Sequence, residues 1–179
     1  MFEQLLLEPV LNRPDLVPAG ITELLQSWQG SIPASEVLGA PRDPECAGSA
    51  EFCEKYQVLP ELGANCVVVE AVRGENRFLA ACLVPIHTRA DLNKTVRKLL
   101  DVRRVSFAPL DEVLQVTGME YGGITPVGLP SSFHILIDAR VVVQEKLIIG
   151  GGYRKSKLLV PGAFLAELPN VQVVEGLGV

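Results

Sequence analysis

The sequence predicts a single α+β domain in which a mixed, mostly antiparallel β-sheet is flanked by helices. The chain has 179 residues, of which 48% are hydrophobic and 21% charged, so it can bury the core of one domain. Apolar runs typical of strands are interleaved with segments of helical periodicity. Many connections between the predicted strands are too short to hold a crossover helix, which argues against a doubly wound parallel sheet.

The N-terminal part is predicted to be an arm followed by two short helices. Residues 1–18 hold three prolines between short apolar clusters, which favours an extended arm lying on the domain formed by residues 19–179. Apolar positions within residues 21–28 follow helical spacing and predict an amphipathic helix. After a loop rich in Gly, Pro and charge, residues 49–56 predict two helical turns that begin at Ser49.

A β-hairpin is predicted at residues 65–85, where two apolar runs flank a turn at 73–76. Thr88 and Asp91 have the spacing of a capping box, and a helix with an apolar stripe and a basic opposite face follows up to Leu100. The middle of the chain therefore contributes two core strands and one helix.

The C-terminal half is predicted to contain short strands and helices around two glycine-rich segments. A helix over 109–116 has a proline at its start, acidic residues in its first turn and Gly118 beyond its end. The other predicted elements are strands at 105–108, 134–138, 146–149, 157–160 and 171–176, and a helix at 161–168.

Composition and charge exclude several classes of protein. Sixteen Lys and Arg against 21 Asp and Glu leave a net charge of -5, which argues against a protein that coats nucleic acid by bulk charge. The apolar stretches are far shorter than the roughly 20 residues that span a bilayer. Glu3 stands where a signal peptide carries positive charge. We therefore expect a cytoplasmic protein with no membrane partner.

The four cysteines predict neither a metal centre nor a nucleophile, because they form no C-x-x-C pair and the chain has only two histidines to join them. Cys66 and Cys82 lie in apolar strands, where a free cysteine behaves as a small buried hydrophobe. Cys46 and Cys53 lie in a more polar stretch that is compatible with exposure. We expect no metal and no cofactor.

The most informative segment is the loop at residues 120–132, which holds three glycines and two prolines between a predicted helix and a predicted strand. Gly122 and Gly123 allow positive φ and a close approach of the backbone to a ligand, so this loop can present amides to a carbonyl group. Composition alone favours a long turn that joins a helix to a strand, since Gly and Pro mark most loops.

A second glycine cluster, residues 150–152, follows an apolar strand and precedes Tyr153, Arg154 and Lys155. This arrangement lets a phosphate or carboxylate approach the backbone beside fixed positive charge, although it matches neither a Walker loop nor G-x-G-x-x-G. A tight turn or a β-bulge fits the same residues.

Six positive charges fall within residues 89–104 of an otherwise acidic chain, among them Lys94, Arg97 and Lys98. They are a candidate footprint for a phosphate backbone, with the solvated face of a helix as the alternative. His134 is an alternative general base, although a histidine within an apolar strand is more often structural.

The segment TGMEYGGITPVGLP at 117–130, followed by a strand that ends in Asp138 and by the glycine run, resembles the YbaK/prolyl-tRNA synthetase-associated domain family. The resemblance covers residues 20–175 and implies the α+β fold of that family. The positions that match the family pattern are Thr117, Gly118, Gly122, Gly123, Thr125, Pro126, Gly128, Asp138 and Gly151.

Members of this family hydrolyse the ester of mischarged aminoacyl-tRNA, and their substrates include Ala and Cys attached to proline tRNA. The resemblance therefore implies a trans-acting deacylase whose partner is the acceptor end of aminoacyl-tRNA, with an aminoacyl-tRNA synthetase as a second candidate partner. Backbone N–H groups of Gly122 and Gly123 would stabilise the oxyanion while a positioned water attacks the ester carbonyl. This mechanism requires no nucleophilic side chain.

The resemblance and the residue types together give three sets of candidate site residues. The catalytic candidates are Asn65, Gly122, Gly123, Thr125 and Asp138. The substrate-binding candidates are Pro126, Gly128, Gly151, Gly152, Tyr153 and His134. The tRNA-binding candidates are Lys94, Arg97, Lys98, Arg154 and Lys155.

One departure from the family pattern concerns its functional lysine, which opens the first hairpin strand where this chain has Asn65. Asparagine keeps hydrogen-bonding capacity but has no charge to hold a phosphate or polarise an ester. Lys155 and Lys157 are candidates to substitute for it. One alternative follows, an impaired member that binds aminoacyl-tRNA or a small aminoacyl-like ligand without turnover. The acidic net charge favours another, a generic α+β domain that binds a small metabolite.

Overall fold

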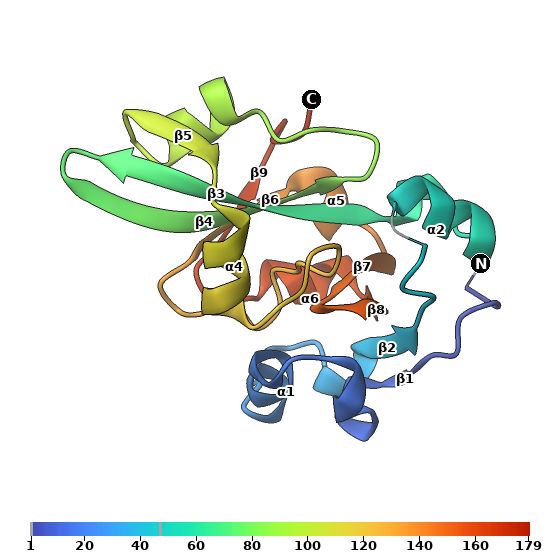
Figure 1. Ribbon diagram of the computed structural model, residues 1–179. Helices are drawn as coiled ribbons and strands as arrows, with labels where there is room; N and C mark the ends of the chain where they lie inside the picture. The colour runs from blue at the N-terminus through green and yellow to red at the C-terminus, as the bar shows by residue number, and fades with distance from the viewer. Residues whose placement is uncertain (1, 47) are drawn as a thin grey trace.

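The computed structural model describes residues 2–46 and 48–179 and confirms the α+β class. Within this part of the chain the strands form two sheets, whereas the sequence predicted one (Figure 1). The strands are β1 (Glu8–Pro9), β2 (Leu38–Pro41), β3 (Ala64–Arg73), β4 (Asn76–Pro85), β5 (Arg104–Phe107), β6 (His134–Asp138), β7 (Leu147–Gly151), β8 (Tyr153–Val160) and β9 (Val171–Val174). The helices are α1 (Ala19–Gln26), α2 (Ser49–Tyr56), α3 (Arg97–Leu99), α4 (Leu110–Thr117), α5 (Ala139–Val142) and α6 (Gly162–Ala166).

The larger sheet has five strands in the order β5-β3-β4-β6-β9. The predicted hairpin is confirmed: β3 and β4 pair antiparallel from Ala64 opposite Pro85 to Arg73 opposite Asn76. β6 and β9 join on the other side as parallel strands, which makes the sheet mixed.

The smaller sheet has four antiparallel strands in the order β1-β2-β8-β7. Its strand β8 begins four residues before the predicted strand at 157–160, and the ladder between β7 and β8 shifts register between Gly150 and Gly151. Sequence patterns did not predict β2, because its four residues include a glycine and a proline. Pairing with β8 makes this segment a strand.

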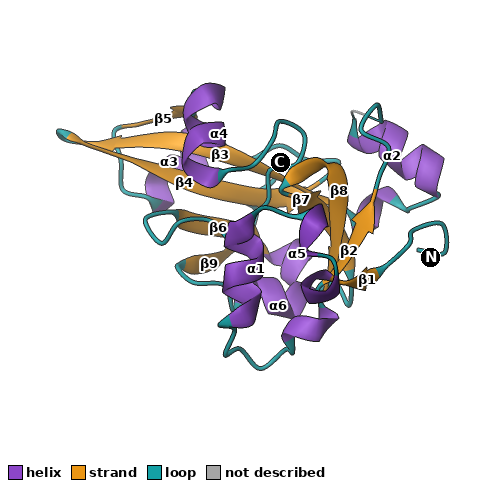
Figure 2. Ribbon diagram, turned by 60° about the horizontal axis from the view of Figure 1, so that its bottom comes forward, coloured by secondary structure: helices purple, strands orange, loops and turns teal. Residues whose placement is uncertain are grey.

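One hydrophobic core joins the two sheets to the helices α1, α5 and α6, which lie together in Figure 2. Ile21 of α1, Ile137 of β6, Leu158 of β8 and Phe164 of α6 are all completely buried in it. Val10 from the N-terminal segment lies in the same core. The smaller sheet is therefore packed against the larger one by shared apolar contacts.

The two faces of the larger sheet are covered by different helices. Val96 and Leu100 pack on the face that carries Val69, whereas Val113 of α4 packs on the face that carries Val68. Successive residues of a strand point to opposite faces, so helices α3 and α4 lie on opposite sides of the sheet. The basic residues of α3 therefore lie on the opposite side of the sheet from α4.

Several local predictions need correction. Asp91, not Thr88, caps the helix that follows the hairpin: its carboxylate accepts hydrogen bonds from the N–H groups of Lys94 and Thr95, while the Thr88 hydroxyl donates to the Pro85 carbonyl. That helix begins with a π-helical turn, Leu92–Val96. Short helix α5 was not predicted, because four residues carry too little periodicity.

Cys46 and Cys53 are buried, at 7% exposure each, although their polar surroundings in the sequence were compatible with exposure. Apolar residues of the smaller sheet and of α2 cover them. Among the residues described, no helix has both the length and the apolar character needed to cross a bilayer.

Candidate functional site

A cavity of about 510 Å³ lies between the start of β3, helix α4, the first part of the glycine-rich loop and the β7–β8 hairpin. Its apolar wall includes Val68, Val113 and Ile124, and its mouth carries the exposed side chains Phe107 and Tyr121. Pockets of this size, largely apolar with a few polar groups, are typical of small-molecule or substituent binding sites.

The start of β3 brings Asn65 to the cavity, as predicted from the sequence. Its side-chain oxygen Oδ1 accepts a hydrogen bond of 2.8 Å from the hydroxyl of Ser49, the first residue of α2. This bond orients the amide, so the Nδ2 group is fixed as a donor on the other side. Ser49 lines the same cavity and was not among the predicted site residues.

Lys157 is the second polar feature of the cavity, and it comes from the smaller sheet. Its side chain is only 8% exposed, and its Nζ lies 5.1 Å from the centre of the Phe52 ring. Burial, with a contribution from the nearby charge of Arg42, lowers the pKa of Lys157 to about 8. Lys155, the other lysine considered as a substitute for the family's lysine, is exposed and lies outside the cavity lining.

Arg42 is 5% exposed and lines the cavity beside Lys157, a position that sequence analysis did not identify. Its Nε donates to the carbonyl of Arg154, Nη1 to that of Cys46 and Nη2 to that of Gly122. Burial lowers the pKa of Arg42, yet an arginine stays charged in proteins. The guanidinium group of Arg42 therefore joins the loop that contains Cys46, the glycine-rich loop and the start of β8.

The two predicted glycine clusters interlock through the backbone. The N–H of Gly152 donates to the carbonyl of Gly123 at 2.7 Å, and the N–H of Glu120 donates to the carbonyl of Gly152 at 2.8 Å. The side chain of Glu120 accepts from the N–H of Arg154 at 2.8 Å. Sequence analysis treated these clusters as separate loops, and the structure joins them into one unit.

The oxyanion role expected of Gly123 needs correction, because its N–H already donates to the carbonyl of Glu120 at 2.9 Å. Gly122 has φ of 84° and lines the cavity together with Ile124. Within residues 2–46 and 48–179, the N–H groups of Gly122 and Ile124 donate no hydrogen bond. The N–H groups of Gly122 and Ile124 are therefore available as donors in residues that line the cavity.

Thr125, Pro126 and Gly128 do not line the cavity; they hold the loop against the body of the protein. Thr125 is completely buried, and its hydroxyl has no hydrogen-bond partner in the described part of the chain. Gly128 has φ of 79°, and a Cβ at this position would lie 2.7 Å from the backbone of Gly20 in α1. These residues shape the loop from behind.

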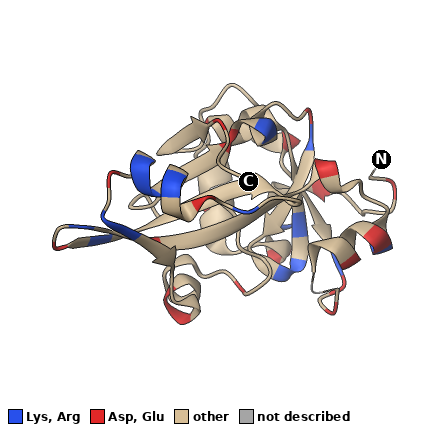
Figure 3. Ribbon diagram, turned by 90° about the horizontal axis from the view of Figure 1, so that it is seen from above, with Lys and Arg blue, Asp and Glu red and all other residues tan. Residues whose placement is uncertain are grey.

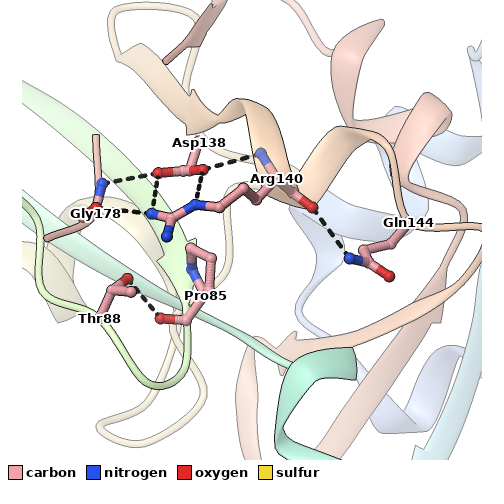
Figure 4. A network of polar contacts seen from close by, with 6 residues as sticks. All are labelled: Pro85, Thr88, Asp138, Arg140, Gln144 and Gly178. Carbon is pink, nitrogen blue, oxygen red and sulfur yellow. Dashed lines mark hydrogen bonds and ion pairs between the residues drawn. The ribbon is translucent and has the colours of Figure 1, made fainter. Parts of the chain in front are cut away.

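Asp138 also lies away from the cavity, in a buried network shown in Figure 4. Its carboxylate accepts 2.8 Å hydrogen bonds from the Arg140 guanidinium and from the N–H of Gly178. Burial opposes its ionisation, but the hydrogen bonds from Arg140 and Gly178 prevail and lower the pKa of Asp138 to about 2. Asp138 therefore anchors the C-terminal segment through Gly178.

The remaining substrate-binding candidates do not line the cavity. His134 is exposed, and its ring centre lies 5.2 Å from that of Phe78, away from the cavity. Gly150 lines the cavity, but Gly151, Gly152 and Tyr153 do not. A Cβ on Gly152 would lie 2.4 Å from the ring of Pro18, so this glycine permits close packing.

The tRNA-binding candidates divide into two groups. Lys94, Arg97 and Lys98 belong to the helical segment on the sheet face opposite α4 and the cavity; Figure 3 views the molecule from that side. Arg154 lies beside Gly122, and its Nε donates to the carbonyl of Pro44. Lys155 is exposed next to it.

The fold defines this chain as a single-domain α+β protein. Its site is a cavity large enough for a small organic group, bordered by two glycine loops that are hydrogen-bonded to each other. The model of the aminoacyl-tRNA editing domain matches residues 43–168, and the chain belongs to that family. The resemblance seen in the glycine motifs is therefore confirmed.

Relatives and solved structures agree with this assignment. A proline–tRNA ligase of Bacillus licheniformis is 24% identical over 149 residues; the match covers 75% of this chain and 26% of the ligase, so the chain spans about a quarter of that relative. A candidate trans-editing enzyme for prolyl tRNA synthetase superposes with a TM-score of 0.70 at 19% identity, covering 93% of this chain and 96% of that one. The hypothetical protein APE2540 superposes with a TM-score of 0.65 at 22% identity, covering 78% and 86% of the two chains. These likenesses show the same fold.

Proposed function

We propose that this chain is a cytoplasmic, trans-acting aminoacyl-tRNA deacylase that hydrolyses the ester of a mischarged tRNA. The observation that carries the proposal is that the family's glycine motif forms the wall of a substituent-sized cavity, with the N–H groups of Gly122 and Ile124 unpaired there. Family membership supports the same reaction class.

In the proposed reaction the aminoacyl group occupies the cavity and its ester carbonyl oxygen faces the N–H groups of Gly122 and Ile124. Water adds to the carbonyl carbon and the carbonyl electron pair moves to oxygen, where the two amides stabilise the charge. Collapse of this intermediate breaks the bond to the ribose oxygen, which takes up a proton. Free amino acid and uncharged tRNA leave.

Water is positioned by neutral groups in this proposal. Among the described residues that line the cavity there is no Asp, Glu or His side chain. Asn65, oriented by Ser49, offers its Nδ2 group, and an activated ester requires orientation more than a strong base. His134 and Asp138 are not needed for this chemistry, because both lie elsewhere.

The acceptor end of tRNA is the proposed partner at the cavity mouth. Phe107 and Tyr121 are 69% and 64% exposed there, and exposed aromatic rings are the platforms on which unpaired bases stack. Arg154, which lies beside Gly122, and the neighbouring Lys155 are proposed to contact phosphates. Lys94, Arg97 and Lys98 are proposed to contact a more distant part of the tRNA, because α3 covers the other face of the sheet.

The test is the release of labelled amino acid from a panel of mischarged and correctly charged tRNAs. We expect one or a few mischarged species to lose their label much faster than in buffer, and Ala108→Trp, which fills the cavity from its lining, to abolish the difference. Val116→Trp, on the exposed surface of α4 and outside the lining, is the matched control. Spontaneous rates for every species with the natural protein would refute the deacylase.

The second candidate is a module that binds aminoacyl-tRNA without turnover. The observation in its favour is that Asn65, which replaces the family's lysine, is uncharged and engaged with Ser49. This candidate predicts retention of aminoacyl-tRNA on the protein with no release of amino acid, and hydrolysis only after Asn65→Lys.

A further inference from the structure

Lys157 is a buried ammonium group without a carboxylate partner. Its side chain is 92% covered, and within residues 2–46 and 48–179 it takes part in no ion pair. Nζ lies over the face of the Phe52 ring, 5.1 Å from the ring centre. An unpaired buried charge destabilises a folded protein, and an apolar side chain of the same length would pack there at lower cost.

The groups that face Lys157 add positive charge and no negative charge. Arg42 approaches from the end of β2 because Ala40 pairs with Lys157 in the antiparallel ladder. The thiols of Cys46 and Cys53 lie on the side of α2, and burial raises the pKa of Cys53, which keeps it neutral. No Asp or Glu of the described chain lines the cavity. The cavity therefore carries two cations that the protein itself does not neutralise.

We propose that Lys157, with Arg42 beside it, binds an oxyanion of the substrate in the cavity. The inference deepens the deacylase proposal, since it names what that site recognises. Two cations in a desolvated cavity attract a carboxylate or phosphate strongly. The energetic cost of the unpaired lysine is then offset when substrate binds.

Aminoacyl-tRNA carries such an oxyanion in two places. One is the phosphate of the terminal nucleotide, which every aminoacyl-tRNA shares. The other is the carboxylate of an acidic aminoacyl side chain, which only tRNA charged with Asp or Glu carries. The chemistry recognised by Lys157 is the same in both cases, and substrate comparison separates them.

The experiment compares the natural protein with Lys157→Met, Lys157→Arg and, as the matched control, Lys146→Met. On a substrate that the natural protein hydrolyses at pH 7, we expect Lys157→Met to lower kcat/KM about ten- to a hundredfold, the range for loss of a charge-assisted hydrogen bond. Lys157→Arg keeps the charge and should retain most activity. The Lys146 variant should match the natural protein, because Lys146 pairs with Glu36 at the surface and lies outside the cavity lining.

Stability separates binding from a structural role. Removing an unpaired buried charge should leave the melting temperature of Lys157→Met equal to or above that of the natural protein. A loss confined to Asp- and Glu-tRNA would identify the side-chain carboxylate, and an equal loss on all charged tRNAs would identify the phosphate. A Lys157→Met variant that is fully active, or one whose lost activity follows lost stability, would overturn the inference.

A direct binding measurement keeps the inference independent of turnover. In the natural protein, NMR of labelled lysine should show the pKa of Lys157 rising when inorganic phosphate is added and unchanged when chloride is added to the same ionic strength. If no charged tRNA is hydrolysed but phosphate still raises the pKa of Lys157, the deacylase proposal fails and the oxyanion site stands. If phosphate leaves that pKa unchanged and Lys157→Met is fully active, the oxyanion site fails alone.

Discussion

Gly123 and Gly152 hold the two glycine loops together at a distance that no side chain permits. The N–H of Gly152 donates to the carbonyl of Gly123 at 2.7 Å, and a Cβ on Gly123 would lie 2.6 Å from the carbonyl oxygen of Gly152. The preceding glycine of the motif, Gly122, is thereby fixed at the cavity wall. The glycine motif therefore allows the two loops to pack closely, and this packing positions the amide groups of the motif.

Gly123→Ala should separate the two loops. The added methyl group meets backbone atoms that cannot rotate away, so we expect a loss of about 1–3 kcal/mol in the free energy of unfolding and a large loss of deacylation. Urea denaturation and the label-release assay measure the two effects. Gly74→Asn, in the open β3–β4 turn at φ of 60°, is the control and should change neither. Natural stability in Gly123→Ala would contradict the interlocked arrangement.

Asp138→Asn should weaken the attachment of the C-terminal segment and leave the chemistry intact. Because the pKa of Asp138 is lowered to about 2 from 3.8, its contribution to stability is complete above pH 4 and is lost as the pH falls through 2. That contribution is on the order of 2 kcal/mol. Unfolding measured between pH 2 and 7 should show this dependence in the natural protein and not in the variant. A variant as stable as the natural protein but inactive would instead make Asp138 catalytic.

Lys157 should give activity and stability opposite dependences on pH. Oxyanion binding requires the ammonium form, so kcat/KM should fall as the pH rises through about 8, the pKa of Lys157 in the folded protein. Folding favours the neutral form, so the unfolded chain binds more protons between pH 8 and 10.5, and stability should rise over that interval by up to about 3 kcal/mol.

The matched comparison for this pH dependence is Lys157→Arg, which keeps its charge throughout the interval. Its kcat/KM should stay flat where that of the natural protein falls. Parallel pH profiles in both proteins would show that another group controls the decline.

Phe107→Ala and Tyr121→Ala should weaken binding of a single-stranded oligonucleotide that ends in CCA. Loss of a stacked base costs about 1–3 kcal/mol, which fluorescence anisotropy can resolve. Both side chains are exposed, so the melting temperature should change little. Val116→Ala, which removes an exposed apolar side chain of α4 away from the mouth, is the control. Equal affinity in all four proteins would place the acceptor end elsewhere.

Local patterns in the sequence were sufficient for much of the fold. The β3–β4 hairpin, helix α4 and its stop at Gly118, where φ is 67°, all follow from the residues that form them. Adjacent residues determine such features, because turn geometry, capping and alternation act over a few positions. The sequence alone was likewise sufficient to identify the glycine motif, the family and the unusual Asn65.

Only the tertiary structure determined which side chains line the cavity. Arg42 and Lys157 stand 115 positions apart, and the pairing of β2 with β8 brings them together although β2 carries no strand signal of its own. The same long-range packing joins the N–H of Gly152 to the carbonyl of Gly123, holds Asp138 in the C-terminal network and places α3 on the far face of the sheet. Charge and hydrogen-bond availability at a site depend on which distant segments desolvate and pair each group, and no local pattern records that.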